Sequence, residues 1–142
     1  MIITLCGSNK FKSEIHRLAN YLYENGFYVH IPAEFNSDIN EESETFYYIQ
    51  KGLLLGHFRK IDQANVVVIC NFNGYIGNST AMELAYAFAK NKFIIALTES
   101  KEMAHNVCIT EFCDTYWADI RKLKNIKNYG DEICDIIKNI VV

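Results

Sequence analysis

The chain alternates short apolar runs with longer amphipathic stretches, and this alternation restricts the folds open to it. A short continuous apolar run that ends at a turn residue is typical of a strand buried on both faces. Parallel strands need long crossover connections between them, and these are usually helices. The sequence therefore predicts an α/β fold, with helices on both faces of a parallel sheet of about five strands. The expected strands are Ile2–Cys6, Phe27–Ile31, Val66–Cys70, Phe93–Leu97 and, as a weaker candidate, Thr115–Ala118.

The segments between these runs carry apolar residues at helical spacing. Two stripes recur at i, i+3, i+4 and i+7, the spacing of one helix face; they consist of Ile15, Leu18, Ala19 and Leu22, and of Ile133, Ile136, Ile137 and Ile140. Asn25-Gly26 is typical of a helix C-terminus and closes the first of these helices. Between them, a long helical region ends near Ala64, and a compact Ala-rich helix is expected over Thr80–Ala89.

Length, charge and cysteine usage exclude several classes of protein. A chain of 142 residues fits one domain, spanning 1–142. The formal net charge is -3 without a basic stripe, so no nucleic-acid partner is expected. The N-terminus opens directly into an apolar strand and no run approaches membrane-spanning length, so we expect a cytoplasmic protein with no membrane contact. The five cysteines form no CxxC pair and no Cys–His spacing typical of zinc, so we expect reduced thiols, with Cys6 and Cys70 buried, and no metal.

Three loops are expected at the sheet edge where ligands bind in such folds, beyond the carboxyl ends of the strands. They are residues 7–9, 32–34 and 71–79, which follow the first three strands. Gly7, Ser8 and Asn9 could cradle a phosphate or a sugar hydroxyl. The same residues also fit a turn followed by a capped helix, and this segment leaves both interpretations open.

The third loop leads into a helix that carries a carboxylate, Glu83. The candidate substrate-binding residues before it are Gly74, Tyr75, Gly77, Ser79 and Thr80. We expect Glu83 in the first helical turn, where the helix dipole keeps a carboxylate ionised, as nucleophilic attack on an anomeric carbon requires. Residues 80–83 also fit a capping box, in which Glu83 reaches back to the Thr80 amide and does no chemistry. Composition alone leaves both interpretations open.

His57 is the other candidate catalytic residue, because the pKa of an ordinary histidine lies near neutrality. A lone helical histidine is also often a bystander. The remaining histidines, at positions 16, 30 and 105, have no convergent partners in the sequence and are interpreted as structural, and Lys60 is expected to be solvated. Tyr47 and Tyr48 fit either stacking on a base or burial in the core or a subunit interface.

Taken together, these segments resemble a known family. They are Leu5-Cys6-Gly7-Ser8, His57-Phe58-Arg59-Lys60-Ile61, the run Asn65–Cys70, and Gly74–Ala87 with its GYIG-x-ST-x-x-E pattern. In this order, over roughly residues 2–97, they resemble the nucleoside 2-deoxyribosyltransferase superfamily, particularly its short bacterial members. They are also similar to the 2'-deoxynucleoside 5'-phosphate N-hydrolases.

The resemblance implies a flavodoxin-like three-layer sandwich and a homodimer or higher homo-oligomer in which neighbouring subunits complete the pocket. It also implies that Glu83 is the nucleophile of a double displacement. The sequence departs from the family at three polar positions. Gly77 stands where the transferases have Asp and the N-hydrolases have Ser, His57 where the N-hydrolases have Asp, and Thr4 where they have Tyr.

Two functions from different classes follow from these observations. The first is cleavage or transfer of the N-glycosidic bond of a nucleoside or nucleoside 5'-monophosphate through a glycosyl-enzyme on Glu83. The alternative is a catalytically inactive nucleotide-binding sensor or signalling module, which the changes at Gly77 and His57 favour. In both, the partner is a nucleoside or nucleotide, and no metal or organic cofactor is expected, because glycosyl transfer needs only a carboxylate and a proton donor.

Overall fold

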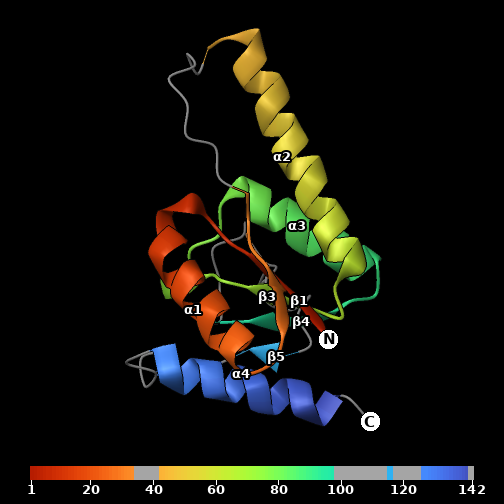
Figure 1. Ribbon diagram of the computed structural model, residues 1–142. Coiled ribbons are helices and arrows are strands. Elements are labelled where there is room, and N and C mark those ends of the chain that lie inside the picture. The colour runs from red at the N-terminus through yellow and green to blue at the C-terminus, as the bar shows by residue number, and fades with distance from the viewer. Residues whose placement is uncertain (34–41, 98–114, 117–125, 141–142) are drawn as a thin grey trace.

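A parallel sheet forms the centre of the computed structural model, which describes residues 1–33, 42–97, 115–116 and 126–140 (Figure 1). Its strand order is β2-β1-β3-β4-β5, and every neighbouring pair is parallel. The strands are β1 (Ile2–Cys6), β2 (Tyr28–His30), β3 (Val66–Ile69), β4 (Phe93–Ala96) and β5 (Thr115–Tyr116). Four strands of three to five residues make up the body of the sheet, and the two-residue β5 pairs with β4 at one edge. The predicted α/β fold with a parallel sheet is confirmed.

The helices lie on both faces of this sheet (Figure 1). They are α1 (Lys12–Glu24), α2 (Glu44–Gln63), α3 (Asn78–Ala89) and α4 (Ile126–Ile140), together with the 3-10 turns η1 (Asn9–Phe11) and η2 (Phe72–Gly74). Alternate residues of the strands point to opposite faces, which divides the apolar core into two clusters. Val66 and Val68 pack with α1 and α4, whereas Val67 and Ile69 pack with α2 and α3. This is the three-layer arrangement that the sequence predicts.

The helix boundaries follow local sequence signals. The α1 helix buries Ile15, Leu18 and Leu22, as its stripe predicts, and ends at Asn25 and at Gly26, whose φ of +94° suits a residue without a Cβ. The Ser43 hydroxyl accepts from the Phe46 amide and begins α2. In α4, Ile133 and Ile137 are fully buried against the sheet. Residues 117–118 of the fifth expected strand lie outside the described residues.

The carboxyl ends of β1 and β3 lie side by side and define the sheet edge that the three loops share. The Cys70 amide donates to the Cys6 carbonyl at 2.7 Å, and the Leu97 amide donates to the Asn71 side chain at 3.0 Å. A Cβ added to Gly7 would lie 3.1 Å from the Cys70 Cβ, so the two chain segments approach too closely for a side chain there. In the part of the chain that the structure describes, we find no helix with the length and apolar character needed to cross a bilayer.

Candidate active site

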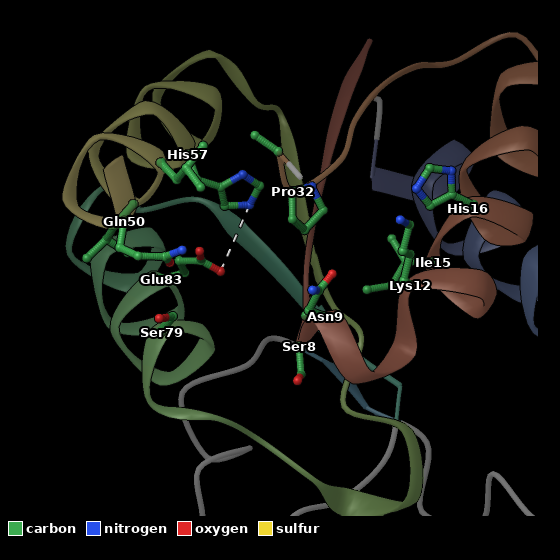
Figure 2. A pocket seen from close by; sticks show the side chains of 14 residues that line it. Ser8, Asn9, Lys12, Ile15, His16, Pro32, Gln50, His57, Ser79 and Glu83 are labelled. Atoms are coloured by element: carbon green, nitrogen blue, oxygen red, sulfur yellow. Dashed lines mark ion pairs between the residues drawn. The ribbon is translucent and has the colours of Figure 1, made fainter. Parts of the chain in front are cut away.

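A cavity of about 210 Å³ opens at this edge of the sheet, between α1 on one side and α2 and α3 on the other (Figure 2). Its lining includes six of the candidate residues from the sequence: Gly7, Ser8, Asn9, His57, Ser79 and Glu83. Four others, Gly74, Tyr75, Gly77 and Thr80, are not among its lining residues. The structure therefore brings the first loop, the end of α2 and the start of α3 together.

The four residues outside the cavity have local structural roles. Gly74 has a φ of +78° in the turn η2, and Gly77 is the N-cap of α3. Tyr75 stacks edge-on against Phe11 and lies under the Lys10 ammonium. Thr80 is buried in α3.

The α3 helix begins earlier than the sequence predicts, and this decides the role of Glu83. It starts at Asn78, so Thr80 lies inside the helix and the capping-box interpretation of residues 80–83 is wrong. The expectation that Glu83 lies in the first turn is also wrong, because it is one turn further along. Ser79 and Glu83 are four residues apart and so share the helix face that lines the cavity.

Burial dominates the electrostatics of Glu83. The side chain is only 7% exposed, and burial raises its pKa from 4.5 to about 7. A hydrogen bond from the Cys6 thiol and the charge of Lys60 act in the opposite direction but are weaker. The expectation that the helix dipole keeps this carboxylate ionised is therefore wrong: near neutral pH the group is balanced between its two forms.

His57 lies beside Glu83 and is neutral at physiological pH. Its Nε2 is 3.9 Å from Glu83 Oε2 (Figure 2). The same nitrogen is 3.3 Å from Cys6 Sγ. Burial, followed by the charge of Lys60, lowers its pKa from 6.5 to about 4. At neutral pH the His57–Glu83 contact is therefore a close approach of an imidazole and a carboxyl group, not a salt bridge. As a neutral ring, His57 carries no second ring proton to supply near neutral pH.

Lys60 holds α2 in place above the sheet. Its ammonium donates to the Ile31 carbonyl at 2.8 Å, and its own carbonyl accepts from the Thr4 hydroxyl at 2.8 Å. The expectation that Lys60 is simply solvated is wrong. These two bonds connect α2, the helix that carries His57, to β1 and to Ile31, the residue after β2.

Sequence reasoning missed Cys6 as a member of the site. It is fully buried, as predicted, but its side chain faces α2 and α3 and lies close to both His57 and Glu83. Burial and the nearby Glu83 raise the pKa of its thiol well above the usual value. A protonated, inaccessible thiol is a poor nucleophile, so the contact with His57 is not a catalytic Cys–His pair.

The donor atoms of Cys6, His57 and Glu83 lie within 4.8 Å of one another and could hold a metal ion. The expectation of no metal relied on local Cys–His spacing. Such spacing gives no signal here, because the three residues come from β1, α2 and α3.

Sequence reasoning also missed the side of the cavity that α1 forms. Lys12 and His16 line it from α1, opposite Glu83 (Figure 2). His16, which the sequence left as a structural residue, thus lies at the cavity. Positions 12 and 16 are four apart on a helix that follows the Gly-Ser-Asn loop, and this spacing was the available signal. His105 lies outside the described residues.

No protein-family model and no curated protein sequence matches this chain. Solved structures do. A 2-deoxyribosyltransferase from the psychrotolerant bacterium Bacillus psychrosaccharolyticus superposes with a TM-score of 0.63 at 17% identity, over 88% of this chain and 91% of that one.

The CMP N-glycosidase BcmB of Clostridium botulinum matches with a TM-score of 0.54 at 17% identity, over 94% of this chain and 98% of that one. A conserved protein from Enterococcus faecalis V583 matches with a TM-score of 0.52 at 13% identity, over 91% and 98%. The resemblance drawn from the sequence motifs is thus confirmed at the level of fold: the chain has the fold of a 2-deoxyribosyltransferase and of a CMP N-glycosidase.

Proposed function

We propose that this protein cleaves or transfers the N-glycosidic bond of a nucleoside or nucleoside 5'-monophosphate, with Glu83 as nucleophile. The observation that carries the proposal is a nearly buried carboxylate that faces a cavity at the carboxyl ends of the strands and is not used as a helix cap. A carboxylate with little hydration is a reactive nucleophile once it is ionised. The raised pKa and the open cavity support this use over a purely structural one.

The proposed reaction is a double displacement. The ionised Glu83 attacks C1' while the C1'–N bond breaks, and the electron pair of that bond leaves with the base. Positive charge develops on the sugar in the oxocarbenium-like transition state, and it is stabilised by the adjacent carboxylate. Water then attacks C1', the C1'–O bond to Glu83 breaks and its electron pair returns to the carboxylate; the attacking water loses a proton and the departed base takes one up, through solvent. A second base that attacks C1' in place of water displaces Glu83 in the same way, loses its ring proton to solvent and gives a new nucleoside. His57 and Cys6 position the carboxyl group through their contacts with it.

The opposite side of the cavity supports a phosphate-bearing substrate. Lys12 and His16 lie across the cavity from Glu83, and the Ser8 side chain belongs to the same wall (Figure 2). A 5'-phosphate is separated from C1' by the width of the sugar, so the Lys12 ammonium and the Ser8 hydroxyl opposite the nucleophile suit a nucleotide. The two neighbours described by name as a 2-deoxyribosyltransferase and a CMP N-glycosidase support the same class of reaction.

A chromatographic screen for released base tests this proposal. The purified protein is incubated with nucleosides and 5'-monophosphates, both ribo and deoxy, with and without a second free base. We expect release from at least one deoxy substrate. Glu83→Gln should lower the rate by about 10³-fold or more, because it keeps the shape of the side chain and removes the nucleophile.

The matched control is Glu132→Gln, the same substitution at an exposed position of α4. It should leave the rate unchanged. Equal rates for wild type and Glu83→Gln would exclude Glu83 as nucleophile.

The nucleotide-binding module without turnover remains the second candidate. It is favoured by the pKa of Glu83, because a substantial fraction of the group is uncharged near neutral pH and tolerates a bound phosphate. Calorimetry separates the two: tight nucleotide binding with no base released from any member of the panel would establish the module and exclude the enzyme.

We also propose that α2 mediates self-association. Only His57 and Ile61 of this 20-residue helix are buried, while Tyr47 and Tyr48 are 61% and 59% exposed. The part of α2 before His57 therefore buries no residue. A helical segment of that length, about three turns, is marginally stable alone and is stabilised by packing against another surface. In light scattering, Tyr47→Lys with Tyr48→Lys should reduce the mass from an oligomer to a monomer; a monomeric wild-type protein would contradict the proposal.

A further inference from the structure

We infer that Cys6, His57 and Glu83 form a binding site for a thiophilic divalent cation, Zn²⁺ first among them, with one coordination position open to the cavity. The three side chains come from β1, α2 and α3: His57 and Glu83 line the cavity, and the fully buried Cys6 lies within reach of both. Nothing in the proposed glycosyl transfer requires this cation, so the inference goes beyond that function.

The distances are close to those of a tetrahedral zinc site. With Zn–S and Zn–N bonds of about 2.3 and 2.0 Å, neighbouring ligand atoms lie roughly 3.3–3.6 Å apart. Here Cys6 Sγ and His57 Nε2 are 3.3 Å apart, and His57 Nε2 and Glu83 Oε2 are 3.9 Å apart. All three donors lie within 4.8 Å of one another. The His57–Glu83 distance would have to shorten by several tenths of an ångström for both atoms to coordinate one ion.

The donor chemistry also suits zinc. A thiolate, an imidazole nitrogen and a carboxylate oxygen are the three ligand types that Zn²⁺ takes in proteins. On binding, the Cys6 thiol and a protonated Glu83 release their protons to solvent. The two resulting negative charges balance the two positive charges of the cation. Both anionic ligands are buried, which is costly without a charge partner, and a dication offsets that cost directly.

Three protein ligands beside an open cavity leave a fourth position for water or for an incoming group. The ring proton of His57 would then sit on Nδ1, which has no hydrogen-bond partner among the described residues. The loss of such an outer partner typically lowers metal affinity by about 10- to 100-fold. We therefore expect this site to bind zinc more weakly than a structural zinc site, by about that factor. If the proposed function holds, bound zinc would also occupy the Glu83 carboxylate and inhibit base release; the binding itself does not depend on that function.

Metal binding is tested on metal-free protein without any nucleoside. Zn²⁺ is titrated in competition with a chromophoric chelator, and Co²⁺ is added in a separate absorbance experiment. We expect one Zn²⁺ per chain and, with cobalt, a thiolate-to-metal charge-transfer band in the near ultraviolet. Cys6→Ala and His57→Ala should each weaken zinc binding by at least about 100-fold, because losing a ligand costs more than losing an outer partner.

The matched control is Cys70→Ala, which removes another buried thiol, directly after the neighbouring strand β3, and should leave zinc affinity unchanged. Circular dichroism verifies that each variant is folded. Unchanged zinc binding in folded Cys6→Ala would overturn the inference by placing the metal at other groups. A wild-type cobalt spectrum without the thiolate band would overturn it even if the variants failed to fold. Neither result bears on base release, so the two proposals can fail separately.

Discussion

Glu83 combines two properties that oppose each other in a folded protein. Its burial makes the carboxylate reactive, and the same burial makes the charged form costly and raises its pKa to about 7. His57, with a pKa lowered to about 4, is neutral over the whole range in which Glu83 titrates and does not compensate its charge. The positive charge that develops on the sugar in an oxocarbenium-like transition state would compensate the negative charge of Glu83. The buried environment of Glu83 therefore favours the transition state over the substrate complex.

The rate of base release should therefore depend on the protonation of Glu83. Only the ionised form attacks, so kcat/KM should rise about tenfold per pH unit below pH 7 and level off above it. Initial rates at subsaturating concentrations of an unphosphorylated nucleoside, measured from pH 5 to pH 9, give this profile. A rate that is flat or falls through pH 7 would show that an ionised Glu83 is not the nucleophile.

At the scale of elements, the site depends on how closely β1 and β3 approach at their carboxyl ends. A Cβ added to Gly7 would meet Ile15 Cδ1 at 2.7 Å, Cys70 Cβ at 3.1 Å and the Cys70 carbonyl oxygen at 3.3 Å. Ile15 is buried and also lines the cavity, so it cannot move aside without changing the cavity wall. The absence of a side chain at Gly7 is thus a packing requirement of the sheet edge.

Gly7→Ala should destabilise the protein by about 1–3 kcal/mol through overpacking. The control is Gly52→Ala in α2, where an added Cβ meets nothing within 4 Å. That substitution should stabilise the protein by about 0.5–1 kcal/mol, because Ala is a better helix former than Gly. Urea unfolding of both variants measures the difference, and equal stability of the two would contradict the packing argument.

At the scale of the whole molecule, the sequence predicts the architecture well, because the pattern of apolar residues is repeated in every element. Val66 to Ile69 are buried on both faces, and the Asn25-Gly26 ending of α1 is a local signal that needs no tertiary context. The site is less predictable, since it depends on which side chains from distant segments meet. Cys6 and His57 are 51 residues apart, and no local spacing announces their contact.

The start of α3 shows the same limit at closer range. Thr80 and Glu83 have the spacing of a capping box, but the helix begins at Asn78, before that box. A shift of two residues changes Glu83 from a capping group into a cavity residue with a raised pKa. Helix boundaries are the least certain part of a sequence-based prediction, and here the chemistry depends on one.

The buried Glu83 should also limit the stability of the whole molecule. Its pKa in the folded state, about 7, lies above its ordinary value of 4.5. Its contribution to stability is therefore fully present below pH 4.5 and is lost as the pH rises through about 7, a change of up to about 3 kcal/mol. Glu83→Gln stays neutral at every pH, so it should be more stable than wild type by up to about that amount at pH 8.

Urea unfolding at pH 8 and near pH 4.5 measures this effect, and the difference between the two proteins should nearly vanish at the lower pH. If the wild type were the more stable protein at pH 8, the charged Glu83 would have to be stabilised by the fold. An inactive but more stable variant is the outcome expected of a site that holds a destabilised functional group.

Trapping the glycosyl-enzyme tests directly whether Glu83 is the nucleophile. A fluorine at C2' destabilises the oxocarbenium-like transition states and slows turnover of the intermediate, so a 2'-fluoro analogue of the best substrate from the screen should leave its sugar on the protein. We expect intact-mass spectrometry to show one added fluorosugar per chain, peptide mapping to locate it on Glu83, and Glu83→Gln to remain unlabelled. A sugar attached to a different residue, or the same labelling in Glu83→Gln, would exclude Glu83 as the nucleophile.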